Sequence, residues 1–128
     1  MSEHQEQVLL TRWVDRWAYE VDGLEMYFAV PNGGHRHKAT AAKMKAEGQR
    51  AGVPDVLLLH PTDLYHGLAL EMKYGKGKVR PTQQEWLTKF ETRGYLTAVC
   101  YSWQEAAQVI CDYLELWPDH QARWELEG

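Results

Sequence analysis

The chain has 128 residues and a formal net charge of −4, with 45% hydrophobic and 25% charged side chains. These values suit one folded domain and exclude collagen-like, low-complexity and disordered chains. No apolar run approaches the roughly 20 residues of a membrane span, and two cysteines are too few for a disulfide framework, so we expect a cytoplasmic protein.

Helical and strand signals alternate along the chain. Leu10, Trp13 and Trp17 recur at helical spacing, which predicts a first helix that ends before Gly23. The expected elements, in chain order, are a helix at 3–21, a strand at 24–30, a helix at 38–47, strands at 56–59 and 68–73, a helix at 81–93, a strand at 95–101 and a helix from 103 to Pro118.

This order, αβαββαβα, predicts an α/β fold with a small mixed sheet and helices on both faces. The strands at 68–73 and 95–101 should form a parallel pair joined by a right-handed crossover. We expect a single domain over residues 1–117, followed by an acidic tail at 118–128.

Positive charge is concentrated in the middle of the chain. Residues 26–111 carry eleven basic and seven acidic side chains, whereas both ends are acidic. The segments His35-Arg36-His37-Lys38 and Lys76-Gly77-Lys78-Val79-Arg80 are the most basic. A basic centre between acidic flanks suits local phosphate binding, although a solvated surface with uneven charge gives the same pattern.

The strand expected at 68–73 carries two charged residues on one face. Side chains alternate along a strand, so Glu71 and Lys73 point to the same side. Burying both charges on an internal strand is costly unless they pair or bind something. An exposed ion pair on an edge strand is the alternative.

Asp55 is the third member of this group. It follows Pro54 at the start of the preceding strand, and an antiparallel pairing of 55–59 with 68–73 brings it near Glu71 and Lys73. Converging carboxylates raise each other's pKa unless a cation lies between them, and oxygen ligands favour Mg²⁺ or Mn²⁺. With a lysine to position a water, this set predicts metal-assisted hydrolysis of a phosphodiester.

Two more polar residues lie on helix stripes that are otherwise apolar. Glu6 continues the buried stripe of the first helix, and Gln83 begins the stripe of Trp86, Leu87 and Phe90. A polar side chain on a core-facing stripe needs a partner, unless the helix end reaches solvent. A carboxylate and an amide would complete a metal and water site.

Six ordered blocks of the sequence resemble the virus-type replication–repair nuclease (VRR-NUC) family of the PD-(D/E)XK nuclease superfamily. The blocks are Glu6-Gln7, Pro31-Asn32-Gly33-Gly34, Gly52-Val53-Pro54-Asp55, Glu71-Met72-Lys73, Gln83 with Trp86-Leu87, and Gly94-Tyr95. The likeness runs from about residue 3 to 114 and implies a restriction-endonuclease-like core.

The likeness also implies roles for individual residues. Asp55 and Glu71 match the metal-binding carboxylates, joined by the backbone carbonyl of Met72, and Lys73 matches the catalytic lysine. The implied cofactor is Mg²⁺, with Mn²⁺ as a substitute.

Two helices contribute the remaining residues of the implied site. Glu6 matches the acidic catalytic and metal-binding residue of the first helix, with Glu3 one turn earlier as the alternative. Gln83 matches the glutamine of the helix after the catalytic strand. The residues expected to contact DNA are Asn32, Gly33, Arg36, Lys38, Lys76, Lys78 and Arg80.

The chain resembles the stand-alone, phage-type members of this family, which places it in the host cytoplasm if a phage encodes it. That likeness implies a Mg²⁺-dependent, structure-selective DNA endonuclease that acts as a homodimer on branched DNA, especially Holliday junctions. A two-fold pair would present two sites to a symmetric junction. The alternatives are a nuclease that prefers flaps, nicks or duplex ends, and a non-catalytic DNA-binding module that keeps the fold.

Overall fold

The computed structural model describes residues 1–31 and 38–116. Within these ranges the elements are α1 (Glu3–Trp17), the 3₁₀ turn η1 (Leu24–Met26), β1 (Tyr27–Ala29), α2 (Lys38–Ala46), β2 (Val56–Leu58), β3 (Leu68–Met72), α3 (Pro81–Glu91), β4 (Leu96–Cys100) and α4 (Trp103–Tyr113). The predicted α/β class and element order are confirmed. The acidic tail at 118–128 lies outside the described residues.

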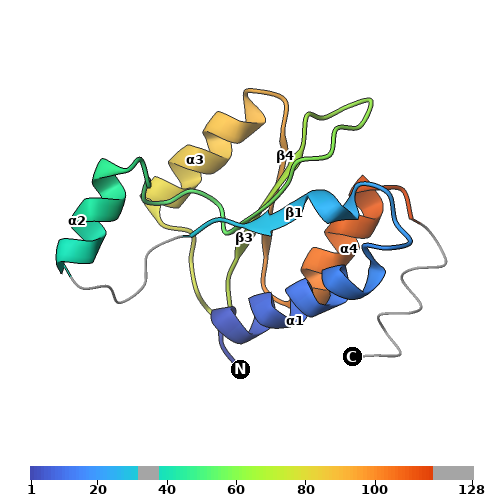
Figure 1. Cartoon of the computed structure of the whole chain (residues 1–128), viewed down its shortest axis with the longest axis horizontal. Helices are drawn as coiled ribbons and strands as arrows, with labels where there is room; N and C mark the ends of the chain where they lie inside the picture. Colours follow the sequence, from blue (N-terminus) through green and yellow to red (C-terminus); the bar gives the residue numbers. More distant parts are fainter. Residues whose placement is uncertain (32–37, 117–128) are drawn as a thin grey trace.

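The four strands form one sheet in the order β1-β2-β3-β4 (Figure 1). β1 and β2 are antiparallel, and so are β2 and β3, in which Val56 lies opposite Leu70. β3 and β4 are parallel, with Met72 opposite Cys100. The antiparallel pairing predicted for 55–59 with 68–73, and the parallel pairing of 68–73 with 95–101, are both confirmed.

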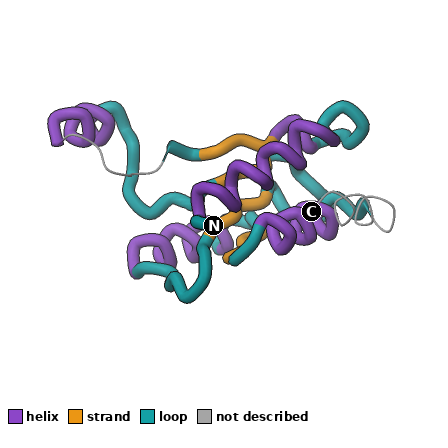
Figure 2. Tube along the Cα trace, turned by 90° about the horizontal axis from the view of Figure 1, so that it is seen from below, coloured by secondary structure: helices purple, strands orange, loops and turns teal. Residues whose placement is uncertain are grey.

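Helices cover the two faces of this sheet. α1 and α4 pack together on one face, and α3 packs on the other (Figures 1 and 2). Leu68, Leu70 and Met72 of β3 are fully buried in the core that α1 and α4 cover. Because side chains alternate along β3, Glu71 must face the opposite side, towards α3.

Leu70 tests how much this core contributes to stability. Replacing Leu70, whose side chain is fully buried, with Ala should lower the free energy of unfolding by about 2–5 kcal/mol, because lost transfer energy and a cavity add together. Urea denaturation measures the change. Leu64→Ala is the matched control, since Leu64 is 82% exposed and its truncation should cost less than about 0.5 kcal/mol. Equal losses in the two variants would contradict this placement of the core.

The first helix is shorter than predicted. It ends at Trp17, with Ala18 as its C-cap, rather than at residue 21. The backbone N–H of Val21 still donates to the carbonyl of Trp17 at 3.1 Å, so a turn keeps Val21 buried without continuing the helix. Gly23 then adopts φ +96°, and a Cβ there would lie 2.6 Å from the ring of His60, so only glycine fits this reversal.

α2 differs from the other helices because it buries none of its residues. It stands away from the sheet and from α1 and α4 (Figures 1 and 2). Among the described residues, no helix combines the length and hydrophobicity required to span a bilayer.

Both cysteines belong to the core. Cys100 ends β4 and Cys111 lies in α4, and both are fully buried. Burial raises the pKa of each thiol to about 12. Neither residue therefore supplies a thiolate at neutral pH.

Candidate active site

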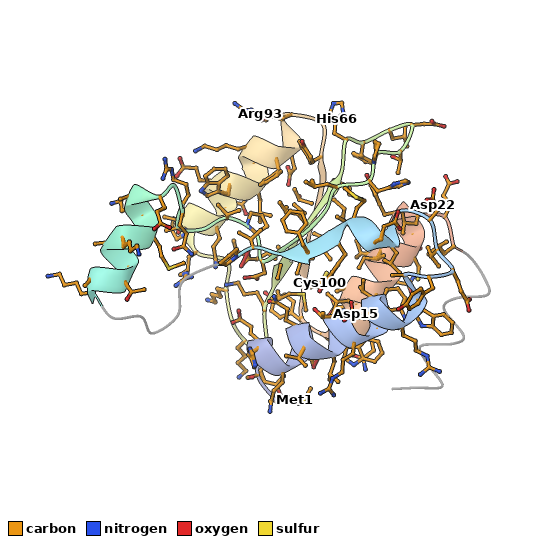
Figure 3. All side chains as sticks on the ribbon, viewed as in Figure 1. Met1, Asp15, Asp22, His66, Arg93 and Cys100 are labelled. Atoms are coloured by element: carbon orange, nitrogen blue, oxygen red, sulfur yellow. The ribbon has the colours of Figure 1, made fainter. Side chains whose placement is uncertain are left out.

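The antiparallel pairing of β2 with β3 brings two carboxylates together. Asp55, directly before β2, accepts a hydrogen bond at Oδ2 from the backbone N–H of Met72 at 2.7 Å. Glu71, next to Met72, is 1% exposed and contacts the Asp55 carboxyl group. The pair lies at the C-terminal end of β3. His66, labelled in Figure 3, precedes the other end of this strand.

The segment that ends at Asp55 contacts the first turn of α3 on one side and the residue after β1 on the other. Gly52 adopts φ +87°, and a Cβ at this position would lie 2.8 Å from the backbone of Thr82 in the first turn of α3. Pro54 is fully buried, and the carbonyl of Asp55 accepts a hydrogen bond from the backbone N–H of Val30 at 2.8 Å. Gly52 therefore permits the close approach that sets Asp55 relative to α3.

Lys73 follows β3 and is held from two directions. Its backbone N–H donates to the carbonyl of Cys100 at 2.8 Å, which extends the parallel pairing by one residue. Its ammonium donates to Oε1 of Gln83 at 2.8 Å and lies 4.0 Å from Oε1 of Glu71. Lys73 and Gln83 are only 5% and 6% exposed, so these polar atoms interact away from bulk water.

Gln83 links the lysine to the loop that follows it. Its Oε1 also accepts a hydrogen bond from the backbone N–H of Arg80 at 2.9 Å, at the start of α3. One amide oxygen thus fixes both the ammonium of Lys73 and the end of the loop over residues 74–80. The polar position that Gln83 occupies on an apolar stripe is explained by this double contact.

The buried carboxyl group of Glu71 has a raised pKa and one oxygen without a hydrogen-bond partner among the described residues. Its pKa is raised to about 8, chiefly by burial and then by the neighbouring Asp55 carboxylate, whereas the ammonium of Lys73 lowers it by less. Oε2 of Glu71 is buried and has no hydrogen-bond partner among the described residues. Buried polar atoms are normally satisfied, so this oxygen is available to a cation.

The carboxylates of this site are the side chains that could hold a divalent metal. The described residues contain no group of three or more His, Cys, Asp or Glu side chains arranged to hold an ion. Two carboxylates, one with an unpartnered oxygen, provide hard oxygen ligands and leave positions open for water or substrate. The residues present therefore fit a hard divalent cation held by few protein ligands.

Glu6 is held by the start of α4. Its Oε2 accepts a hydrogen bond from the backbone N–H of Trp103 at 2.9 Å, at the first position of α4. A buried carboxylate at a helix N-terminus satisfies a free N–H and interacts favourably with the helix dipole. Glu6 thus ties α1 to α4, which explains its place on the buried stripe.

Glu3 is the first-helix carboxylate that acts on the pair. Its negative charge contributes to the raised pKa of Glu71. Glu3 also lines a cleft of about 550 Å³ together with Gln7, Thr11 and Asp55. The spacing of residues 3, 7 and 11 marks a polar stripe beside the buried one, and this stripe is visible in the sequence.

Four of the residues expected to contact DNA are described, and their side chains are exposed: Lys38, Lys76, Lys78 and Arg80. Three of them lie in the loop over 74–80, between Lys73 and α3. No sequence pattern indicates a contact between Tyr101 and this loop, yet the Tyr101 hydroxyl donates to the carbonyl of Gly77 at 2.9 Å. Asn32, Gly33 and Arg36 lie outside the described residues.

This sheet has one carboxylate directly before β2, a second on β3 and a lysine two residues after the second. The arrangement defines a nuclease domain of the PD-(D/E)XK type. The family model of the VRR-NUC domain matches residues 1–104, and the chain therefore belongs to the VRR-NUC family. The family resemblance predicted from the sequence is confirmed.

A solved structure described as a "VRR_NUC domain protein" has the same fold. It superposes with a TM-score of 0.76 at 26% sequence identity, over 91% of this chain and 90% of that chain. No curated protein matches the sequence. Membership of this nuclease family implies DNA as the substrate, and PD-(D/E)XK nucleases generally use divalent metals.

Proposed function

We propose that this protein is a Mg²⁺-dependent endonuclease that hydrolyses phosphodiester bonds in branched DNA. The observation that carries the proposal is the meeting of Asp55, Glu71 and Lys73 at one end of β3. Glu71 brings a buried, unpartnered oxygen, and Asp55 opens onto a cleft. A binding module has no use for a buried carboxylate and a half-buried one beside a phosphate, which disfavours the non-catalytic alternative.

In this proposal, Asp55, Glu71 and the backbone carbonyl of Met72 hold Mg²⁺, and Mn²⁺ substitutes for it. When bound, the metal supplies a Lewis acid that polarises the scissile phosphate. Glu3, rather than Glu6, is the first-helix carboxylate that acts at this site, because it lines the cleft with Asp55.

Lys73 orients the attacking water and stabilises its deprotonated form. The hydrogen bond to Gln83 fixes the ammonium before substrate binds, so little reorganisation is needed during the reaction. Gln83 is a positioning residue in this scheme, since it acts through Lys73. The low exposure of both side chains strengthens the electrostatic effect of the ammonium.

The exposed cations Lys38, Lys76, Lys78 and Arg80 contact phosphates. Such contacts fix the position of the duplex without reading its sequence. The loop over 74–80 is tied at one end to Lys73 through Gln83, so phosphates bound there are aligned with the catalytic groups. Asn32, Gly33 and Arg36 also contact DNA in this proposal.

We further propose that two copies act together on a four-way junction. Each site cuts one strand, and a two-fold homodimer presents two equivalent sites to a substrate of matching symmetry. Preference for flaps, nicks or duplex ends is the alternative within the nuclease class.

The test compares cleavage of a labelled four-way junction with cleavage of a linear duplex of the same sequence, in Mg²⁺ and in EDTA. Junction cleavage in Mg²⁺, with little cleavage of the linear duplex and none in EDTA, is the expected result. Equal cleavage of both DNAs would contradict the junction preference, and a panel of flaps and nicked duplexes would then identify the substrate. Tight binding without cleavage in Mg²⁺ or Mn²⁺ would favour the non-catalytic module.

A further inference from the structure

A second hollow lies next to the catalytic cleft. It has a volume of about 460 Å³ and is lined by the C-terminal part of α2, the chain that follows it, and one side chain of α3. Val30 and Pro31, at the end of β1, line both this hollow and the cleft that contains Asp55. A nucleotide bound near Asp55 is therefore within reach of the hollow.

The walls of this hollow are mainly apolar, with one large aromatic side chain. Met44, Val53 and Trp86 provide these walls. Trp86 belongs to the stripe predicted to be buried, but it remains partly exposed, whereas its neighbour Leu87 is buried. An indole left partly in solvent beside a catalytic cleft is not explained by packing of the core.

Neighbouring residues of α3 hold the indole in place. The ring of Phe90 lies 6.2 Å from that of Trp86, and the ammonium of Lys89 lies 4.7 Å from the Trp86 ring centre. An aromatic ring packed in this way loses little side-chain entropy when it binds a ligand. Such pre-organisation favours binding.

Positive charge lies on the wall of this hollow and along α2, the helix whose C-terminal part lines it. Arg50 lines the hollow, and α2 carries three exposed lysines, Lys38, Lys43 and Lys45, whereas Glu47 is the acidic residue on the hollow's rim. Since α2 buries none of its residues, these charges are not required to support a core. An apolar hollow among exposed cations matches a nucleotide, which combines a flat base with a charged phosphate.

We propose that this hollow binds an unpaired nucleobase of the DNA whose phosphate lies at Asp55 and Glu71. The inference rests on the proposed nuclease function and deepens it. Bases stack on aromatic side chains irrespective of sequence, and an unpaired base leaves the stack at lower cost than a paired one. The hollow therefore gives the enzyme a preference for DNA with unpaired nucleotides, independent of base identity.

The test measures binding of the full chain in EDTA, where no cleavage is expected, to two duplexes with one bulged nucleotide. In one duplex that nucleotide carries adenine, and in the other it is abasic. Wild type should bind the adenine bulge about 5-fold or more tightly than the abasic bulge by fluorescence anisotropy. Trp86→Ala and Met44→Ala should remove this difference and leave affinity for the abasic duplex unchanged, whereas Trp86→Phe should retain most of it.

Tyr19→Ala is the matched control, because Tyr19 is 95% exposed and does not line the hollow. It should preserve the preference for adenine. Met44→Ala provides a second test in case the Trp86 variant misfolds. Its own folding should be unaffected, because α2 buries none of its residues. Equal binding of the two bulges by wild type, or an intact preference in both Trp86→Ala and Met44→Ala, would overturn the proposal.

The same experiment separates this inference from the nuclease proposal. If wild type prefers the adenine bulge in EDTA but cleaves no DNA in Mg²⁺ or Mn²⁺, the hollow binds bases and the nuclease proposal fails. If wild type cleaves junctions but binds both bulges equally, the nuclease proposal stands and the hollow has no such role.

Discussion

Replacing Lys73 with Met should reduce the rate of junction cleavage by a factor of about 10²–10³, because the variant lacks the oriented ammonium that stabilises developing negative charge. Methionine keeps most of the aliphatic stem, so packing beside Glu71 changes little. Gln83 retains one donor, the backbone N–H of Arg80 at 2.9 Å, so its oxygen is not left unsatisfied. Single-turnover cleavage at saturating enzyme measures the effect, with DNA affinity in EDTA as the test of binding.

Lys76→Met is the matched control for this prediction. Lys76 is exposed in the loop over 74–80, and its loss should weaken DNA binding and reduce the salt dependence of affinity without changing the saturated rate. If Lys73→Met cleaves at the wild-type rate, or if Lys76→Met loses as much rate, the catalytic assignment of Lys73 is wrong.

Replacing Glu71 with Gln should abolish the heat of Mn²⁺ binding and reduce cleavage as severely as the Lys73 variant. The glutamine is nearly isosteric, but its neutral amide is a much weaker cation ligand than a carboxylate. Titration calorimetry with Mn²⁺ and single-turnover cleavage measure the two losses.

The same variant should change how the stability of the metal-free protein depends on pH. The pKa of Glu71 is raised from 4.5 to about 8 by burial and by Asp55, so the folded state holds this proton more tightly than the unfolded state. The free energy of unfolding should therefore fall as pH rises from about 4.5 to about 8, by at most about 1.4 kcal/mol per pH unit from this group. Glu71→Gln should lose this slope.

Urea denaturation in EDTA at several pH values measures the slope, and Glu85→Gln serves as an exposed control that should retain it. Adding Mg²⁺ at pH 8 should raise the free energy of unfolding of wild type but not of Glu71→Gln, since a ligand that binds only the folded state stabilises it. Parallel pH profiles for wild type and Glu71→Gln would show that Glu71 is not buried beside Asp55.

Local sequence patterns were sufficient to predict the order of the helices and strands and which side chains share a face of a strand. The two-residue period placed Glu71 and Lys73 on the face opposite Leu70. Serine favours helix N-termini, and Ser102 caps α4, where its hydroxyl accepts from the N–H of Glu105. Both features depend on residues close together in the chain. Local patterns failed at the end of α1. Val21 continues the helical spacing of apolar residues, but it lies in a turn after the helix has ended.

The first helix shows where local patterns were ambiguous. Glu3 and Glu6 are one turn apart, and either matches the acidic residue of the family. The choice depends on α4, because the N–H of Trp103, 97 residues further along the chain, binds Glu6. Likewise, the exposure of Trp86 depends on how α2 and the chain after it are placed, not on the stripe of α3.

By itself, the sequence determined which chemical groups this protein carries, the order of its helices and strands, and its membership of a nuclease family. Tertiary structure alone decided which of those groups meet. The contact of Asp55 with Met72 and the contact of Lys73 with Gln83 join different elements across the sheet and α3. Their geometry depends on strand register and on close packing at Gly52, because no local preference specifies distances between residues far apart in the chain.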